Sequence, residues 1–87
     1  MKETEYVDSK IGSEIRKMLS PDLAVLDLSN IGFQTIPGFI SDFQQLEILN
    51  LSGNQIREID FNILSKNECL YSLDMSGNYV VDCYYDR

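Results

Sequence analysis

Residues 46–59 read LEILNLSGNQIREI, and the apolar residues in this stretch keep a fixed spacing. With Leu46 counted as position 1, leucines stand at positions 1, 4 and 6, and isoleucines stand at positions 11 and 14. Two further stretches repeat this spacing, with apolar residues or a cysteine at the same five positions: Leu23, Leu26, Leu28, Phe33, Ile36 and Leu70, Leu73, Met75, Val80, Cys83. The copies begin 23 and 24 residues apart, so the chain contains an internal repeat.

Position 9 of the repeat carries an asparagine in two of the three copies. Asn54 follows Leu-Ser-Gly and Asn78 follows Met-Ser-Gly, where an amide side chain can bond backbone groups as the chain leaves a strand. We therefore expect these asparagines to stack as a ladder. The first copy has Ile31 at this position, which removes one rung.

These residues resemble the leucine-rich-repeat pattern L-x-x-L-x-L-x-x-N-x-L over residues 23–83, most of the chain. In the first copy, Ile36-Pro37 and Ile40 continue the x-x-I-P-x-x-I extension of units with 23 or 24 residues, and Phe43 is the last inward residue. The resemblance implies a short member of the family with about three repeats.

The spacing predicts an α/β fold of the leucine-rich-repeat solenoid type. Positions 4 and 6 lie on one face of a strand because side chains alternate, which leaves positions 3, 5 and 7 facing solvent. Stacked coils then align their leucines into one core behind a short curved parallel sheet. Loops or short helical turns form the convex side, one of them around Ile63 and Leu64.

A capping helix is expected before the repeats. Apolar residues recur there at i, i+4, i+7 and i+8, the spacing of a helical stripe, and a proline follows them: Ile11, Ile15, Met18, Leu19 and Pro21. We predict that residues 9–19 form a helix covering the first coil. The predicted organisation is a tail and cap over residues 1–22 and repeats over residues 23–87, divided as 23–45, 46–69 and 70–87.

Composition narrows the classes of partner. The 87 residues carry seven basic and fourteen acidic side chains, a net charge of -7, and the basic ones are scattered, which argues against direct nucleic-acid binding. No apolar run approaches the roughly 20 residues that span a bilayer, and the first residues lack the apolar stretch of a secretion signal. We expect no membrane association and a cytoplasmic or nuclear location.

The inventory of reactive residues argues against catalysis. The chain has no histidine and no phosphate-binding glycine motif, and we predict no enzyme activity, no cofactor and no metal site. Cys83 shares its position with Ile36 and Ile59, which predicts burial, and Cys69 is expected to be half-buried. Both are interpreted as free thiols, although spacing alone leaves a disulfide between them open.

The solvent-facing strand positions form a candidate protein-binding surface. Its middle column is acidic or amide and suits a partner that presents Lys or Arg beside a small apolar group. The residues are Val25, Asp27, Ser29, Ile48, Asn50, Ser52, Ser72, Asp74 and Ser76, with Tyr71 at the rim. The alternative is that these are ordinary solvated strand residues.

The carboxyl end is apolar and aromatic, and no second helix is expected to cover it. Its candidate interface residues are Tyr79, Val81, Tyr84 and Tyr85. Either the tail folds back with the tyrosine rings as a lid, or another chain completes the stack.

The sequence thus favours an acidic, non-catalytic scaffold that binds a partner protein through its concave sheet or its open carboxyl edge. The alternative function is a small structural subunit of a larger complex, such as a ribonucleoprotein, or a homodimer paired through the under-capped end.

Overall fold

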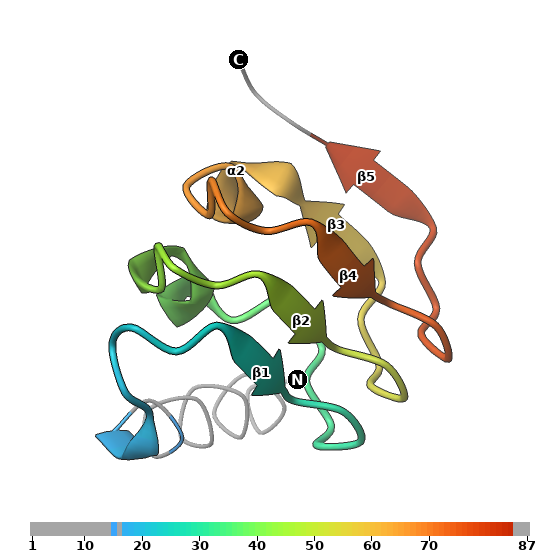
Figure 1. The fold of residues 1–87 in the computed structure, drawn as a ribbon. Coiled ribbons are helices and arrows are strands. Elements are labelled where there is room, and N and C mark those ends of the chain that lie inside the picture. The colour runs from blue at the N-terminus through green and yellow to red at the C-terminus, as the bar shows by residue number, and fades with distance from the viewer. Residues whose placement is uncertain (1–14, 16, 85–87) are drawn as a thin grey trace.

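The structure, a computed structural model, describes residue 15 and residues 17–84, with side chains described as far as Val81. Its elements are β1 (Val25–Asp27), the 3-10 helix η1 (Gly38–Asp42), β2 (Ile48–Asn50), β3 (Glu58–Asp60), α2 (Phe61–Leu64), β4 (Ser72–Asp74) and β5 (Asp82–Tyr84). β1, β2 and β4 form a parallel sheet, and β3 and β5 form a second one. The strands of each sheet lie side by side in successive coils (Figure 1).

The register of the three-stranded sheet matches the repeat in the sequence. Leu26 pairs with Leu49, and Leu49 pairs with Leu73, so residues one repeat apart become neighbours on adjacent strands. Leu26 and Leu49 are buried, whereas the strand residues on either side of them point outward. The predicted alignment of position 4 in one interior is therefore confirmed.

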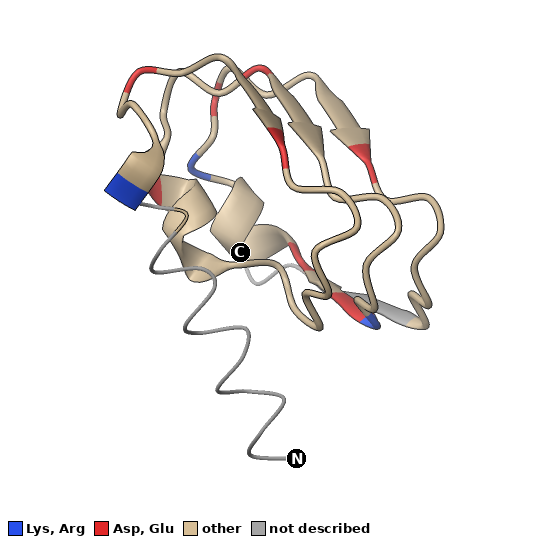
Figure 2. Ribbon diagram, turned by 90° about the horizontal axis from the view of Figure 1, so that it is seen from below, with Lys and Arg blue, Asp and Glu red and all other residues tan. Residues whose placement is uncertain are grey.

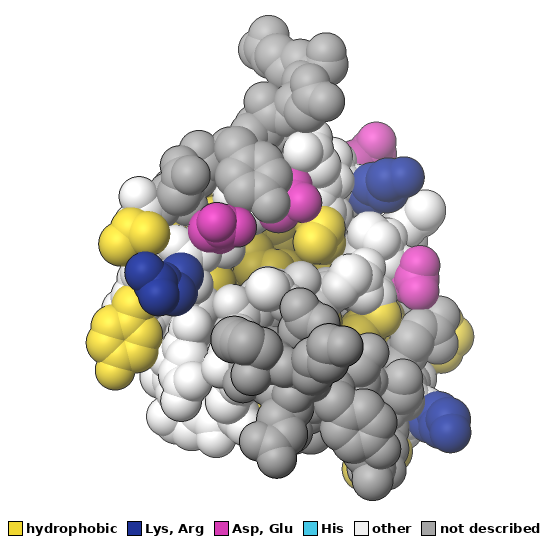
Figure 3. Space-filling view, turned by 180° about the vertical axis from the view of Figure 1, so that it is seen from behind, with side chains coloured by type: hydrophobic (Ala, Val, Ile, Leu, Met, Phe, Trp, Pro, Cys, Tyr) yellow, Lys and Arg dark blue, Asp and Glu magenta, His cyan; other side chains and the backbone are white. Residues whose placement is uncertain are grey.

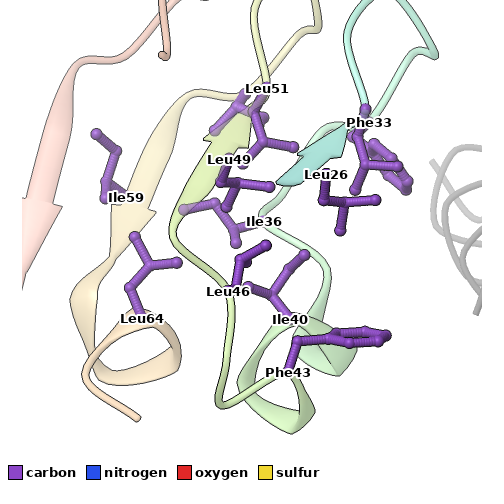
Figure 4. Close-up of a cluster of buried hydrophobic side chains, with 12 residues drawn as sticks. Leu26, Phe33, Ile36, Ile40, Phe43, Leu46, Leu49, Leu51, Ile59 and Leu64 are labelled. Atoms are coloured by element: carbon purple, nitrogen blue, oxygen red, sulfur yellow. The ribbon is translucent and has the colours of Figure 1, made fainter. Parts of the chain in front are cut away.

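Side chains from the opposite side of each coil complete the core. Ile40 and Phe43 come from η1 and the residue that follows it, and Leu64 comes from α2. All three are buried in the same core cluster as the leucines of the sheet (Figure 4). The short helical turn predicted around Ile63 and Leu64 is thus present as α2.

Asn67 is a buried polar residue that the sequence analysis did not single out. It stands three residues before Leu70, as Phe43 stands three residues before Leu46. Its Nδ2 donates to the carbonyl oxygens of Ile40 at 2.9 Å and Phe43 at 2.7 Å. The amide thus gives each carbonyl a second hydrogen bond, because the amides of Phe43 and Leu46 already donate to them.

The pairing of β3 with β5 was also not predicted. Ile59 lies opposite Cys83, in agreement with the position they share in the repeat. The two segments meet because the coils run parallel beyond the asparagine turn: the amide of Val81 donates to the carbonyl of Arg57 at 2.8 Å. Asp60 then ends β3 and caps α2 by accepting from the amide of Asn62 at 2.9 Å.

The segment before the repeats agrees only partly with the prediction. Ile15 and Leu19 pack against the core, but Met18 is 83% exposed, so its predicted inward position is wrong. The helical conformation ends at Met18, and Leu19 in the bend that follows packs against the core as predicted. The remainder of the predicted helix, residues 9–14 and 16, lies outside the described residues. Within the part described, no helix is long and apolar enough to cross a membrane.

The asparagine ladder is confirmed. Asn54 is buried, and its Oδ1 accepts from three consecutive amides of the first coil, at 3.1 Å from Ile31, 2.8 Å from Gly32 and 3.0 Å from Phe33. Its Nδ2 donates to carbonyls of both coils, those of Leu28 and Leu51. One side chain thereby joins two coils where both chains leave the sheet.

Replacing the Asn54 side chain should lower the free energy of unfolding. Asn54→Ala leaves buried amide and carbonyl groups unpaired, and we expect a loss of about 3 kcal/mol or more in the free energy of unfolding. Asn78→Ala is the matched control, because Asn78 is half-buried and its Oδ1 accepts from the amide of Ile56. Urea unfolding followed by circular dichroism should show a clearly smaller loss for Asn78→Ala. Equal losses would contradict the assigned role of Asn54.

Candidate functional site

The predicted binding residues of the strands lie together on the solvent side of the three-stranded sheet, here called the outer sheet face. The register places Val25, Ile48 and Ser72 in one column and Asp27, Asn50 and Asp74 in the next. Figure 2 shows the acidic positions at the ends of β1 and β4, with an uncharged position on β2 between them. Ser29, Ser52 and Ser76 follow directly after this polar column.

The serines orient the acidic column. The Oδ1 of Asp27 accepts from the Ser29 amide at 3.0 Å and the Ser29 hydroxyl at 2.7 Å. Asp74 accepts from the amide of Ser76 at 2.9 Å and its hydroxyl at 2.7 Å. In the middle strand the amide of Ser52 donates to the Oδ1 of Asn50 at 2.9 Å. The hydroxyls of Ser29 and Ser76 are therefore engaged within the chain.

This recurrent turn could have been predicted. An Asp or Asn followed two residues later by serine is typical of a turn in which the side chain accepts from the i+2 amide. The motif occurs in all three copies, as Asp-Leu-Ser, Asn-Leu-Ser and Asp-Met-Ser. The turn is followed in each copy by a residue with left-handed φ: Asn30 at 57°, Gly53 at 69° and Gly77 at 71°.

These hydrogen bonds keep the carboxylates charged. The side-chain and then the backbone hydrogen bond from Ser29 lower the pKa of Asp27 below its ordinary value of 3.8. Ser76 lowers the pKa of Asp74 in the same way. The second oxygen of each carboxylate accepts no hydrogen bond from any described residue. The outer sheet face therefore presents two fixed negative charges that solvent or a partner can reach.

Apolar groups flank this polar column. Val25 is 62% exposed, although it lies within β1, and Ile48 beside it is half-buried. Tyr71 precedes β4 and is 73% exposed, with its amide bonded to the carbonyl of Glu47 at 3.0 Å. Tyr71 is thus exposed directly before the first residue of β4.

Tyr79 and Val81 lie elsewhere, on the return segment of the third coil. The amide of Tyr79 donates to the carbonyl of Ile56 at 3.0 Å, so this segment runs beside the second coil. Both side chains are exposed, Tyr79 at 65% and Val81 at 75%, and the tyrosine lid over the last coil stays a prediction. Figure 3 shows that hydrophobic side chains reach the surface on the back of the molecule. The side chain of Tyr84 and all of Tyr85 lie outside the described residues.

The cysteine predictions have separate outcomes. Cys69 is a free, exposed thiol, so its predicted half-buried state is wrong. The turn that returns the chain to β4 buries Asn67 and leaves the two residues after it outside the core. Cys83 occupies the predicted strand position in β5, and its side chain lies outside the described part of the structure.

Comparison with known proteins identifies the family. The sequence profile described as leucine rich repeat matches residues 21–80. A phospholipase A2 inhibitor of Gloydius brevicaudus siniticus is 39% identical over 68 residues, which cover 77% of this chain and 20% of that protein. The chain thus spans about a fifth of the length of this curated relative. Because the profile match extends over more than half of the residues and the strand register follows the repeat, the chain belongs to the leucine-rich-repeat family.

Proposed function

We propose that this chain is a non-catalytic module that binds another protein through the outer sheet face. The observation that carries the proposal is the pair of oriented carboxylates, Asp27 and Asp74, with lowered pKa values, together with the exposed side chain of Val25 on the strand of Asp27. Membership of a repeat family and a relative named as an inhibitor of an enzyme support a binding role. Charged groups that are held in place give specificity at lower entropic cost than flexible ones.

The spacing of the charges indicates the kind of partner. Neighbouring strands lie about 4.8 Å apart, so Asp27 and Asp74 on the two outer strands are about 10 Å apart, with Asn50 between them. Two helix turns, or seven residues, rise about 10.5 Å. A helix with basic residues at i and i+7 and a small apolar residue beside them therefore fits this face.

The first 22 residues have a supporting role in this proposal. Ile15 and Leu19 pack against the core ahead of the repeats, which begin at Leu23. We propose that this segment caps the first coil of a short curved solenoid and leaves the outer sheet face accessible. A solenoid needs such a cover because its terminal coil otherwise exposes core residues.

Removing the two charges should weaken binding without disturbing the turns. In Asp27→Asn/Asp74→Asn the amide oxygen can still accept from the serine, as Asn50 already does. The probe is a helical peptide with lysines at i and i+7. We expect its affinity at low salt to fall about threefold to tenfold, the range for two exposed charge pairs. NMR titration of the labelled protein measures the affinity.

The matched control is Asp22→Asn/Glu58→Gln, which changes the net charge equally but lies outside the outer sheet face. It should bind the peptide nearly as well as the natural chain. An equal loss in both double variants would mean that net charge alone attracts the peptide. Unchanged affinity in Asp27→Asn/Asp74→Asn would remove the outer sheet face as the binding site.

The pH dependence follows from the lowered pKa values. The folded-state pKa of Asp27 and of Asp74 lies below 3.8, so both side chains stay ionised as the pH falls toward that value. Their contribution to stability is present above the unfolded-state pKa and is lost as the pH falls through the folded-state pKa. Carboxyl-carbon NMR titration should give midpoints below 3.8 for both residues.

Two serine variants test whether the serine hydrogen bonds lower the pKa of each aspartate. Ser29→Ala should raise the midpoint of Asp27 and leave that of Asp74 unchanged, and Ser76→Ala should do the reverse. If the titration midpoint of either aspartate does not change when the serine two residues later is replaced, the serine hydroxyl does not stabilise the charge.

A further inference from the structure

The two ends of the repeat stack differ in how well the core is covered. At positions 4, 6 and 11, the residues of the first coil are at most 5% exposed and those of the second coil are fully buried: Leu26, Leu28, Phe33 and Leu49, Leu51, Ile56. The corresponding residues of the third coil, together with Leu70 at position 1, are only partly buried. We call Leu70, Leu73, Met75 and Val80 the open end.

Within the described residues, backbone groups are also unpaired at the open end. β4 is the last strand of its sheet, as β5 is of the other. Ser72 donates its amide to the carbonyl of Glu47 at 3.2 Å, and the carbonyl of Asp74 accepts from the amide of Leu51 at 2.8 Å, both toward β2. Backbone groups alternate in direction along a strand, so the N–H and C=O of Leu73 point to the free edge.

The side chains on either side of Leu73 could form hydrogen bonds with the same side chains of a second copy. Ser72, on one side of Leu73, carries a hydroxyl donor, and Asp74, on the other side, carries a carboxylate acceptor. A two-fold axis through Leu73 exchanges these two positions. It therefore places each serine opposite the aspartate of a second copy, with the two leucines facing one another in the middle.

We propose that the open end binds the open end of a second copy of this chain, with β4 antiparallel to β4 of the copy and Leu73 on the two-fold axis. The N–H and C=O groups of the two Leu73 residues then bond one another, as in a hydrogen-bonded antiparallel pair. Both three-stranded sheets join into one of six strands, and the partly buried residues of both third coils are covered. The contact is closed, because the two-fold axis makes both copies use the same surface, and it produces a dimer and not a fibre.

Other registers of the β4–β4 pairing are less favourable than the one centred on Leu73. A slip by one residue would place inward side chains opposite outward ones. Pairing centred on Asp74 would bring two carboxylates directly opposite one another, which is destabilising. Pairing centred on Ser72 would place Leu73 opposite Tyr71, whose amide already donates to Glu47. Centring on Leu73 avoids these conflicts and uses the free backbone groups.

The opposite end of the stack does not favour the same contact. Ile15 and Leu19 pack against the core there, and the first-coil residues at positions 4, 6 and 11 are already buried. At positions 4, 6 and 11 a contact through this end would therefore bury little additional apolar surface, although Leu23 at position 1 is partly buried, as Leu70 is. The difference between the ends selects a tail-to-tail dimer.

The test is the mass of the 87-residue chain in solution. Sedimentation equilibrium at increasing concentration should show the apparent mass rising from the 10.0 kDa of one chain to twice that value, without larger species. A chain that stays monomeric at the highest soluble concentration, or that assembles beyond the dimer, would overturn the proposal.

Substitutions at Ser72 test the register, because this exposed side chain can change without disturbing the core. Ser72→Asp faces Asp74 of the copy with a like charge and should raise the dissociation constant at least tenfold. Ser72→Lys faces the same carboxylate with the opposite charge and should preserve or tighten the dimer. Val25→Asp, in the same column but on β1, should leave the dissociation constant unchanged.

Circular dichroism should show the same fold for all three variants. Equal effects of Ser72→Asp and Ser72→Lys, or an effect of Val25→Asp as large as that of Ser72→Asp, would contradict the Leu73-centred contact. These readouts concern self-association alone, so they are independent of whether a basic peptide binds the outer sheet face.

Discussion

The structure depends on the satisfaction of backbone groups where each coil leaves the sheet. A strand of three residues forms few hydrogen bonds, and the chain must turn immediately afterwards into the core of its neighbour. At this point the side chain of Asn54 accepts from three amides of the first coil and donates to carbonyls of the first and second coils. Without that amide, close stacking of the coils would bury unpaired polar groups, and the leucines could not share an interior.

The residues that turn the chain also shape its surface. Asp27, Asn50 and Asp74 each accept from a serine two residues later, just before the residue with left-handed φ that leads to the asparagine position. The same turn therefore serves the fold and fixes the direction of the side chains on the outer sheet face. Asn50 shows that the turn requires only an acceptor oxygen. The negative charge at Asp27 and Asp74 is consequently a property beyond what the fold needs.

The sequence predicts those parts of the fold that follow from periodicity. The register of Leu26, Leu49 and Leu73, the rungs at Asn54 and Asn78, and the helical turn near Leu64 all repeat a spacing, so position alone locates them. Other features depend on geometry that periodicity does not encode. Asn67 is buried and its amide donates to the carbonyls of Ile40 in η1 and of Phe43 after it, whereas Met18 is exposed although it shares the apolar spacing of Ile15 and Leu19. On the outer sheet face, the positions of the residues follow from spacing, whereas the serine hydrogen bonds depend on the local turn.

The asymmetry between the two ends is a consequence of building a core from stacked coils. An inner coil such as the second is covered on both sides, and its residues at positions 4, 6 and 11 have no exposure. Among the described residues, the third coil has a neighbouring coil on one side only, and the same side chains stay partly exposed although their spacing is equally regular. Substitutions within the third coil cannot bury these side chains completely, because the contacts that would bury them come from an adjacent coil. The open end thus offers a surface for association that lies next to the outer sheet face and shares Asp74 with it.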